Sequence, residues 1–298
     1  MSVQLSDLTA SVALAPDAPA GGRFVRRLRS DPLGLLGLCL VLLVIFCGLT
    51  ANWITPYDPF KINVAARFME PGLAHILGTD NLGRDILSRV IKGSQIALMV
   101  GVTSIVISLA IGLVLGLIAG YAPRWLDNIL LLIFDSIYSF PTVMLGLTVI
   151  TLLGPDLSTL MLVVVVIQTP GYARLVRTAT LAKMNSEYIL AERSLGAGPI
   201  RILAKHILPN IIGPLFILGS MDIPSVITLE AGLTYLGMGI PPPAPSWGRI
   251  LNEGYNVIRE APWVVIGGGI PLIITTLGFT FLGEALRDLI DPKLRKIV

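Results

Sequence analysis

The chain has 298 residues, of which 54% are hydrophobic and 14% are charged, and its net charge is +3. Soluble domains carry about 25% charged residues, so this composition excludes an ordinary soluble fold. The charges are clustered and leave apolar stretches of about 18 or more residues, long enough to cross a bilayer as helices. The small net charge argues against nucleic-acid binding and leaves the basic residues to set orientation. The sequence therefore predicts an all-α integral membrane protein in the lipid bilayer.

Six apolar stretches are expected to cross the membrane. The third is interrupted by Asp135 and Pro141, and a proline-rich segment at 237–247 cannot be helical throughout because proline lacks an amide donor. We expect that segment to be an external loop or a broken re-entrant piece. The expected spans cover residues 33–53, 96–121, 129–153, 158–174, 210–236 and 263–282.

The spans suggest three regions of the chain. Residues 1–30 lack the basic start and apolar core of a signal peptide and are expected to be a disordered cytoplasmic tail. Residues 31–94 hold the first transmembrane helix and an external loop, for which a short helix on the membrane surface is an open alternative. Residues 95–298 form a five-helix core.

Orientation is predicted from the distribution of lysine and arginine. With six spans and both termini in the cytoplasm, the inner segments hold roughly twice as many basic residues as the outer ones. Within the second span, Gly112, Gly116 and Gly120 are spaced by four residues, and such a stripe lets helices approach closely in lipid.

The loop at 187–209 has the pattern of two short helices joined by a glycine. Tyr188, Ala191 and Leu195 fall on one helical face, after which Gly196 ends or bends the helix. Pro199 suits the first turn of a second helix. An amphipathic stripe then follows at Ile200, Leu203, Ala204 and Ile207. This pattern predicts either a knob that docks into a partner or a loop packed on the chain's own helices or the membrane surface.

The same loop is similar to the coupling loop of ABC-importer permeases, whose pattern is E-A-A, three residues, glycine, nine residues and I-x-L-P. Aligned on the glycine, the chain matches at Ala191, Gly196, Leu208 and Pro209 and departs at Leu190, Glu192 and His206. Three further segments resemble signatures of the dipeptide, oligopeptide and nickel permease group, specifically its second, shorter membrane subunit. They read H-I-L-G-T-D-N-L-G-R-D at 75–85, L-G-M-G-I-P-P-P-A-P-S-W-G-R-I-L at 236–251 and L-R-D-L-I-D-P-K-L at 286–294.

This resemblance implies a six-helix, type I ABC-importer permease of the bacterial inner membrane. Such a subunit pairs with a paralogous permease as a heterodimer, sits on two ABC ATPase subunits and receives cargo from an extracytoplasmic solute-binding protein. ATP and Mg²⁺ would be bound by the ATPase subunits, since this chain has no G-x-x-x-x-G-K-[ST] phosphate loop. The residues implied in ATPase coupling are Ala191, Glu192, Leu195, Gly196, Ile200, Leu203, Ile207 and Pro209.

Three acids lie within apolar spans, and a charge at the bilayer centre costs roughly 3 kcal/mol, so such groups face a protein interior or a wet cavity. Asp135, Asp222 and Glu230 either line the path of a zwitterionic or cationic cargo or satisfy structural partners. The segment at 75–85 offers an internal ion-pair latch or a contact for the binding protein. Its candidate residues are Gly78, Thr79, Asp80, Gly83, Arg84 and Asp85.

Metal chemistry is not expected. The only histidines, His75 and His206, lack ligand-spaced partners, and Cys39 and Cys47 lie too close along one helix for a disulfide framework.

Two other classes compete with an importer subunit. A secondary transporter or channel would explain the buried acids but not the glycine-hinged loop, and such carriers commonly show inverted repeats. A membrane-embedded enzyme would need a nucleophile with a base or a metal cluster, and the sequence offers neither. The cargo remains open among dipeptides, oligopeptides, nickel and other small solutes.

Overall fold

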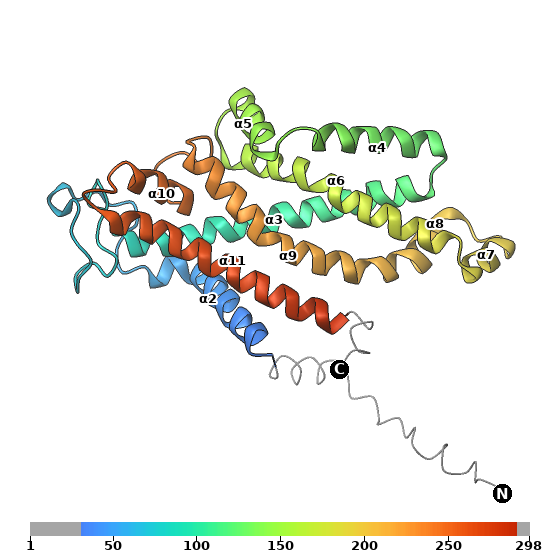
Figure 1. The fold of residues 1–298 in the computed structure, drawn as a ribbon, viewed down its shortest axis with the longest axis horizontal. Helices are drawn as coiled ribbons and strands as arrows, with labels where there is room; N and C mark the ends of the chain where they lie inside the picture. Colours follow the sequence, from blue (N-terminus) through green and yellow to red (C-terminus); the bar gives the residue numbers. More distant parts are fainter. Residues whose placement is uncertain (1–30, 291–298) are drawn as a thin grey trace, which may run out of the picture.

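Residues 31–290 are described by a computed structural model, in which long helices run side by side (Figure 1). The predicted tail at 1–30 and the last basic residues lie outside this range. No β-strand occurs within residues 31–290. The helices are α2 (Pro32–Ile54), α3 (Ile86–Tyr121), α4 (Arg124–Tyr138), α5 (Thr142–Leu153), α6 (Leu157–Met184), α7 (Glu187–Ser194), α8 (Pro199–Arg201), the π-helical η2 (Ile202–Ile207), α9 (Leu208–Tyr235), α10 (Trp247–Tyr255) and α11 (Pro262–Ile290), with a 3₁₀ turn η1 (Val64–Ala66).

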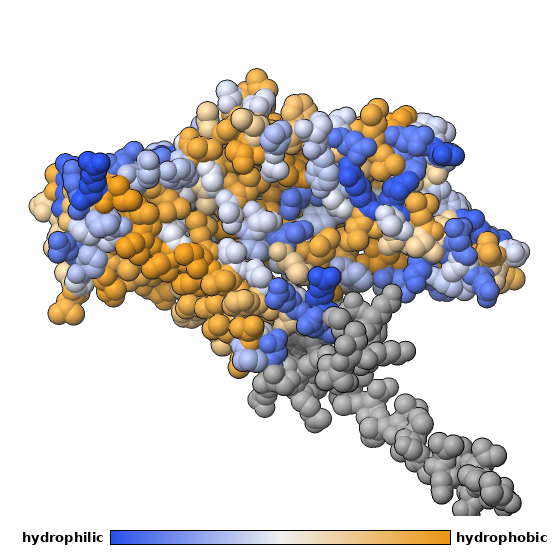
Figure 2. All heavy atoms as spheres, in the orientation of Figure 1, coloured by the Kyte–Doolittle hydropathy of each residue, from blue (hydrophilic) through white to orange (hydrophobic). Residues whose placement is uncertain are grey.

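The expected number of membrane spans agrees with the structure. Five helical segments in the described range are long and apolar enough to cross a membrane, and the bent pair α4–α5 makes a sixth. Hydrophobic side chains cover α2 and α11 on the face shown in Figure 2, whereas hydrophilic ones gather at the two ends of the molecule. One end carries residues 55–85 and α10 and is called the motif end. The other carries α7 and α8 and is called the α7 end (Figure 1).

Two helices extend beyond the predicted membrane spans, whose limits were set at charged residues. α3 begins at Ile86, not near residue 96, and its 36 residues extend about 54 Å, well beyond a hydrocarbon layer of about 30 Å. Its Lys92 donates hydrogen bonds to Asn52 and Gln95. α6 likewise continues to Met184, past the predicted end at 174.

α6 can continue because its two arginines pair with acids on α4. Arg177 Nε lies 2.5 Å from Asp127 Oδ1, and Arg174 pairs with Asp135. These two pairs hold α4 alongside α6 (Figure 1). The third span is therefore not one helix: α4 and α5 meet at 89° across the break at 139–141, where Pro141 disfavours helical backbone in the residue before it.

The predicted close helix approach is confirmed where α3 packs on α6. A methyl group on Gly116 would lie 2.5 Å from the carbonyl oxygen of Ala173, and one on Gly112 would lie 2.6 Å from Cβ of Tyr172. Separations this short leave no room for any side chain. The glycine stripe therefore sets the distance between the two helices that carry the centre of the bundle.

We predict that Gly116→Ala destabilises the folded chain by about 1–3 kcal/mol, because overpacking must push α3 away from a backbone carbonyl. The measurement is thermal unfolding of the full-length protein in one detergent. Gly232→Ala on α9 is the matched control, since a methyl group there meets nothing within 4 Å. The control should be neutral or gain up to about 1 kcal/mol of helix propensity. Equal behaviour of the two variants would refute the packing argument.

Candidate functional site

The loop at the α7 end has the predicted helix–glycine–helix form. α7 ends at Ser194, and Gly196 takes a φ of 83°, a left-handed conformation that favours glycine. Its amide donates to the Arg193 carbonyl and the Ala197 amide to the Glu192 carbonyl, both at 3.0 Å. This pair of bonds is a Schellman motif. Pro199 then opens α8, so the predicted turn is confirmed.

The second half of the loop packs differently from the predicted stripe. Ile200 is 83% exposed, whereas Ile202 and Ile207 are fully buried. The predicted separate helix is wrong too, because α8, η2 and α9 join into one helical segment, Pro199–Tyr235. The cause is the π-helical turn, whose i→i+5 bonding brings residues five apart onto one side. An ordinary α-helical reading would place Ile202 and Ile207 on different faces.

The loop is fixed to the bundle on one side and open on the other. Ile189, Ile202 and Ile207 belong to the main hydrophobic cluster, and the Arg193 guanidinium lies 5.8 Å from the Tyr121 ring centroid. On the open side Leu195 is 84% exposed and Ile200 is 83% exposed. Tyr188 and Ala191 share that exposed side. Packing on the chain's own helices is therefore confirmed for one side of the loop. The other side presents an exposed apolar tip, and its docking into a partner stays a prediction.

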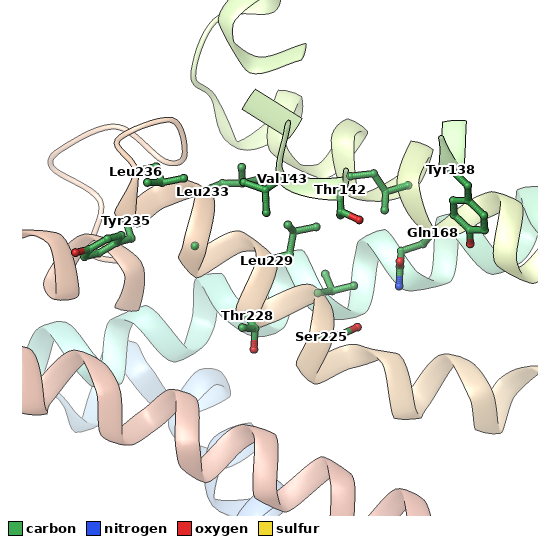
Figure 3. A pocket seen from close by; sticks show the side chains of 13 residues that line it. Tyr138, Thr142, Val143, Gln168, Ser225, Thr228, Leu229, Leu233, Tyr235 and Leu236 are labelled. Atoms are coloured by element: carbon green, nitrogen blue, oxygen red, sulfur yellow. The ribbon is translucent and has the colours of Figure 1, made fainter. Parts of the chain in front are cut away.

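A cavity of about 730 Å³ lies between α5, α6 and α9. Figure 3 shows Thr142, Gln168, Ser225 and Thr228 among the side chains that line it, with Leu229 and Val143 between them. Its volume falls in the range of small-molecule sites. It is an apolar chamber with a sparse set of hydroxyl and amide groups.

Asp222 sits one helical turn beyond this cavity, toward the α7 end. It precedes Ser225 on the same face of α9, and Tyr172 follows Gln168 by one turn on α6. The Tyr172 hydroxyl donates to Asp222 Oδ2 at 2.8 Å. The two helices that line the cavity thus carry an acid–phenol pair at its margin.

The other two predicted lining acids lie elsewhere. Asp135 is on the exposed side of α4, paired with Arg174, whose guanidinium also lies 4.8 Å from the Tyr138 ring. Glu230 is 1% exposed and accepts a bond from the Thr234 hydroxyl at 2.9 Å. It is not among the residues that line the cavity. All three acids therefore have partners within the chain, and none of them lines the cavity. Asp222 lies one turn from the lining residue Ser225, and the Asp135–Arg174 pair lies beside the lining residue Tyr138.

A buried ion network organises the motif end. Asp80 is fully buried and its Oδ2 accepts from Arg84 Nε at 2.7 Å and from an Arg89 Nη at 2.5 Å. Both arginines also donate to Glu253 on α10, at 2.9 and 2.5 Å. Two cations and two anions thus neutralise one another out of water. They join residues 55–85, α3 and α10 into one unit.

The rest of the predicted motif supports this network. Asp85 caps α3 by accepting from the Ser88 amide at 2.7 Å, and its other oxygen lies 2.9 Å from His75 Nδ1. Thr79 Oγ1 accepts from the Met69 amide at 2.8 Å. Gly78 and Gly83 have φ of 73° and 72° and no room for a side chain.

The sequence did not predict the part that Arg89 and Glu253 play in the ion network at the motif end. They are separated by 164 positions, so no local pattern relates them. The only available signal was that both charges border apolar segments. In the loop between α2 and α3, where a helix on the membrane surface was an alternative, the structure has only the three-residue turn η1.

Comparison with known proteins defines the class. Residues 112–296 match the family described as binding-protein-dependent transport system inner membrane component. Residues 21–71 match the N-terminal TM domain of oligopeptide transport permease C. The chain is 37% identical over 265 residues to the di/tripeptide transport system permease protein DppC of Pseudomonas aeruginosa, covering 87% of this chain and 88% of that one.

Further relatives agree with this assignment. The glutathione transport system permease protein GsiD of Pectobacterium atrosepticum is 38% identical over 273 residues, with 91% of each chain covered. A solved structure of the MetNI methionine ABC transporter in inward-facing conformations matches with a TM-score of 0.54 and 20% identity. That match covers 69% of this chain and 98% of the other and shows a shared fold.

The chain belongs to the family of inner membrane components of binding-protein-dependent transport systems. It is a multi-pass permease subunit of an ABC importer, with the type I importer fold, as the resemblance implied. It is a membrane component and not the ATP-hydrolysing one.

We predict that Asp80→Asn lowers the stability of the full-length protein by about 3–5 kcal/mol, because two buried arginines would share one remaining carboxylate. Thermal unfolding in detergent measures this. Glu260→Gln, which removes an exposed carboxylate at the same end, should change little. A small loss for Asp80→Asn, no greater than that of the control, would mean that the network does not hold the motif end together.

Proposed function

We propose that this chain forms one half of a translocation pathway for peptides, driven by ATPase subunits that dock at the α7 end. The observation that carries the coupling proposal is the exposed tip at Leu195 and Ile200, held on a loop whose other side is buried. Exposed apolar groups on a rigid scaffold mark interaction sites. A partner that closes on this tip would move α6 and α9, because the loop joins those two helices directly.

The second half of the pathway is assigned to a paralogous permease subunit. Hydroxyl and amide groups at membrane depth are costly to leave against hydrocarbon, so a polar cavity wall calls for protein or water as its neighbour. The wall built by α5, α6 and α9 carries the Gln168 amide as such a group, beside the Ser225 and Thr228 hydroxyls, which donate to carbonyls of their own helix. A heterodimer that covers it would enclose a path between the two chains.

In the proposed orientation, the α7 end lies in the cytoplasm and the motif end lies outside, where a solute-binding protein would deliver cargo. Both termini would then be cytoplasmic. The start of α2 packs near the end of α11, since a methyl group on Gly34 would lie 2.7 Å from Cβ of Ala285. The excess of basic residues expected on that side supports this orientation. ATP and Mg²⁺ would be bound only by the ATPase subunits.

Peptide cargo is supported by the names of relatives that transport di- and tripeptides or glutathione. Asp222 supplies a chemical reason within the chain. A carboxylate at the cavity margin attracts the protonated amino group that a peptide carries, and the Tyr172 hydroxyl holds that carboxylate in place. Asp222 would therefore meet the cationic end of a cargo as it leaves the cavity toward the cytoplasm.

We predict that Gly196→Val reduces ATP-driven uptake severalfold while the chain still inserts and co-purifies with its ATPase subunits. A β-branched residue at a φ of 83° costs roughly 1–3 kcal/mol and would reorient the exposed tip. The measurement is peptide uptake and coupled ATP hydrolysis by the complex in vesicles. Uptake in vesicles without any ATPase subunit would instead point to a secondary transporter.

Two variants serve as controls for Gly196→Val. Gly198→Val changes a neighbouring glycine whose φ is −74° and whose surroundings are open, so it should keep most of the activity. Gly196→Asn should be milder than valine because asparagine tolerates the left-handed region. Full activity of Gly196→Val would disprove the coupling role of this turn.

We predict that Asp222→Asn lowers uptake of a cationic peptide more than uptake of an acidic peptide of equal length. The amide keeps the bond from Tyr172 but removes the charge that attracts ammonium groups. Glu230→Gln is the matched control, since Glu230 is buried away from the cavity and should alter stability without changing the ratio. An unchanged ratio for Asp222→Asn would remove Asp222 from the pathway.

A further inference from the structure

α2 changes neighbours along its length and so leaves a wedge-shaped gap. In its first half it packs on α11, where a methyl group on Gly37 would lie 2.6 Å from the Leu282 amide nitrogen. In its second half it packs on α3, where a methyl group on Gly48 would lie 2.5 Å from Cδ1 of Leu98. Near its end the Asn52 amide oxygen accepts from Lys92 on α3 at 2.6 Å. Toward the motif end, therefore, α2 and α11 diverge over α3.

A crevice of about 200 Å³ occupies this gap. Val44 and Cys47 of α2 line one side, Ile270 and Ile274 of α11 the other, and Trp247 also borders it. The hydrogen-bonding side chains on its wall are already satisfied. The Trp247 indole donates to the Val90 carbonyl at 3.0 Å, and the Ser94 hydroxyl donates to the same carbonyl at 3.2 Å. A site with no free polar partner does not hold water.

The rim of the crevice is apolar and is separate from the cavity between α5, α6 and α9. Leu43 and Phe46 on α2 and Ile270 and Ile273 on α11 are all exposed. The same two helices carry hydrophobic side chains over the face shown in Figure 2. The crevice shares no lining residue with the cavity between α5, α6 and α9. It therefore opens to hydrocarbon and not to the side that calls for a partner chain.

We propose that this crevice binds one acyl chain of a bilayer phospholipid, from the leaflet on the side of the motif end. The size and the mostly apolar wall, whose Ser94 and Trp247 donors are satisfied, suit part of a single flexible hydrocarbon chain, and the surrounding bilayer supplies it at high concentration. A filled crevice restores the packing contacts that an empty one would lack. The bound chain fills the wedge between α2 and α11 and touches Trp247, the first residue of α10.

This position connects the lipid to the motif-end network. Trp247 packs on α3, since a methyl group on Gly93 would lie 2.8 Å from its Cδ1. α10, which starts at Trp247, carries Glu253, the carboxylate that joins Arg84 and Arg89. An acyl chain in the crevice would therefore support α10 from the membrane side. The inference does not depend on the cargo or on the ATPase partners.

The test uses the full-length chain, purified with its associated subunits in nanodiscs that contain a phosphatidylethanolamine with a diazirine at the middle of one acyl chain. After photolysis, the labelled peptides are mapped by mass spectrometry. We expect label to concentrate in the crevice-lining segments 87–94 and 267–274. Cys47→Phe, which fills the crevice with a ring, should reduce that label severalfold.

Cys39→Phe is the matched control, because Cys39 is an exposed cysteine on the same helix and does not line the crevice. It should leave the label unchanged. With the unsubstituted protein, excess unlabelled phospholipid should compete for the label and glycerophosphoethanolamine, which has no acyl chains, should not. Label spread evenly along the exposed faces of α2 and α11, or equal label in both phenylalanine variants, would overturn the proposal.

Discussion

The constraint on which the rest of the structure depends is that an ionisable side chain near hydrocarbon needs a polar or charged partner within the protein. Arg174 and Arg177 on α6 meet Asp135 and Asp127 on α4, and these pairs position α4 along the inner part of the bundle. Arg84 and Arg89 meet Asp80 and Glu253 and tie α3 to α10. Each end of the bundle is thus fastened by ion pairs, while the middle is set by the glycine contact between α3 and α6.

The loop at the α7 end combines rigidity with exposure, and transmission of force needs both. The buried residues Ile189, Ile202 and Ile207 hold the loop to the main cluster, so the proposed docking of an ATPase subunit on its tip would move α6 and α9. Leu195 and Ile200 remain unpaired on the outside. The π-helical turn places Ile202 and Ile207 together on the buried side, which an ordinary α-helix would not do.

Two hollows on the protein differ in chemistry and therefore in their neighbours. The larger, between α5, α6 and α9, carries hydroxyl and amide groups and ends near the Asp222–Tyr172 pair, which suits water and a solute. The smaller, between α2, α3 and α11, leaves no hydrogen-bonding group free. Under the two proposals, α2 and α11 would form the lipid-facing wall and the wall built by α5, α6 and α9 would serve transport.

The sequence by itself determined the features that depend on near neighbours in the chain. Apolar length predicted the spans, the four-residue glycine spacing predicted the α3–α6 contact, and Gly196 with Pro199 predicted the turn. The tertiary structure alone decided which charges are paired, where α3 begins and where α6 ends. It also decided that Glu230 is enclosed while Asp222 borders the cavity. The reason is physical: helix periodicity and a positive φ are local requirements, whereas Arg89 and Glu253 satisfy each other across 164 residues.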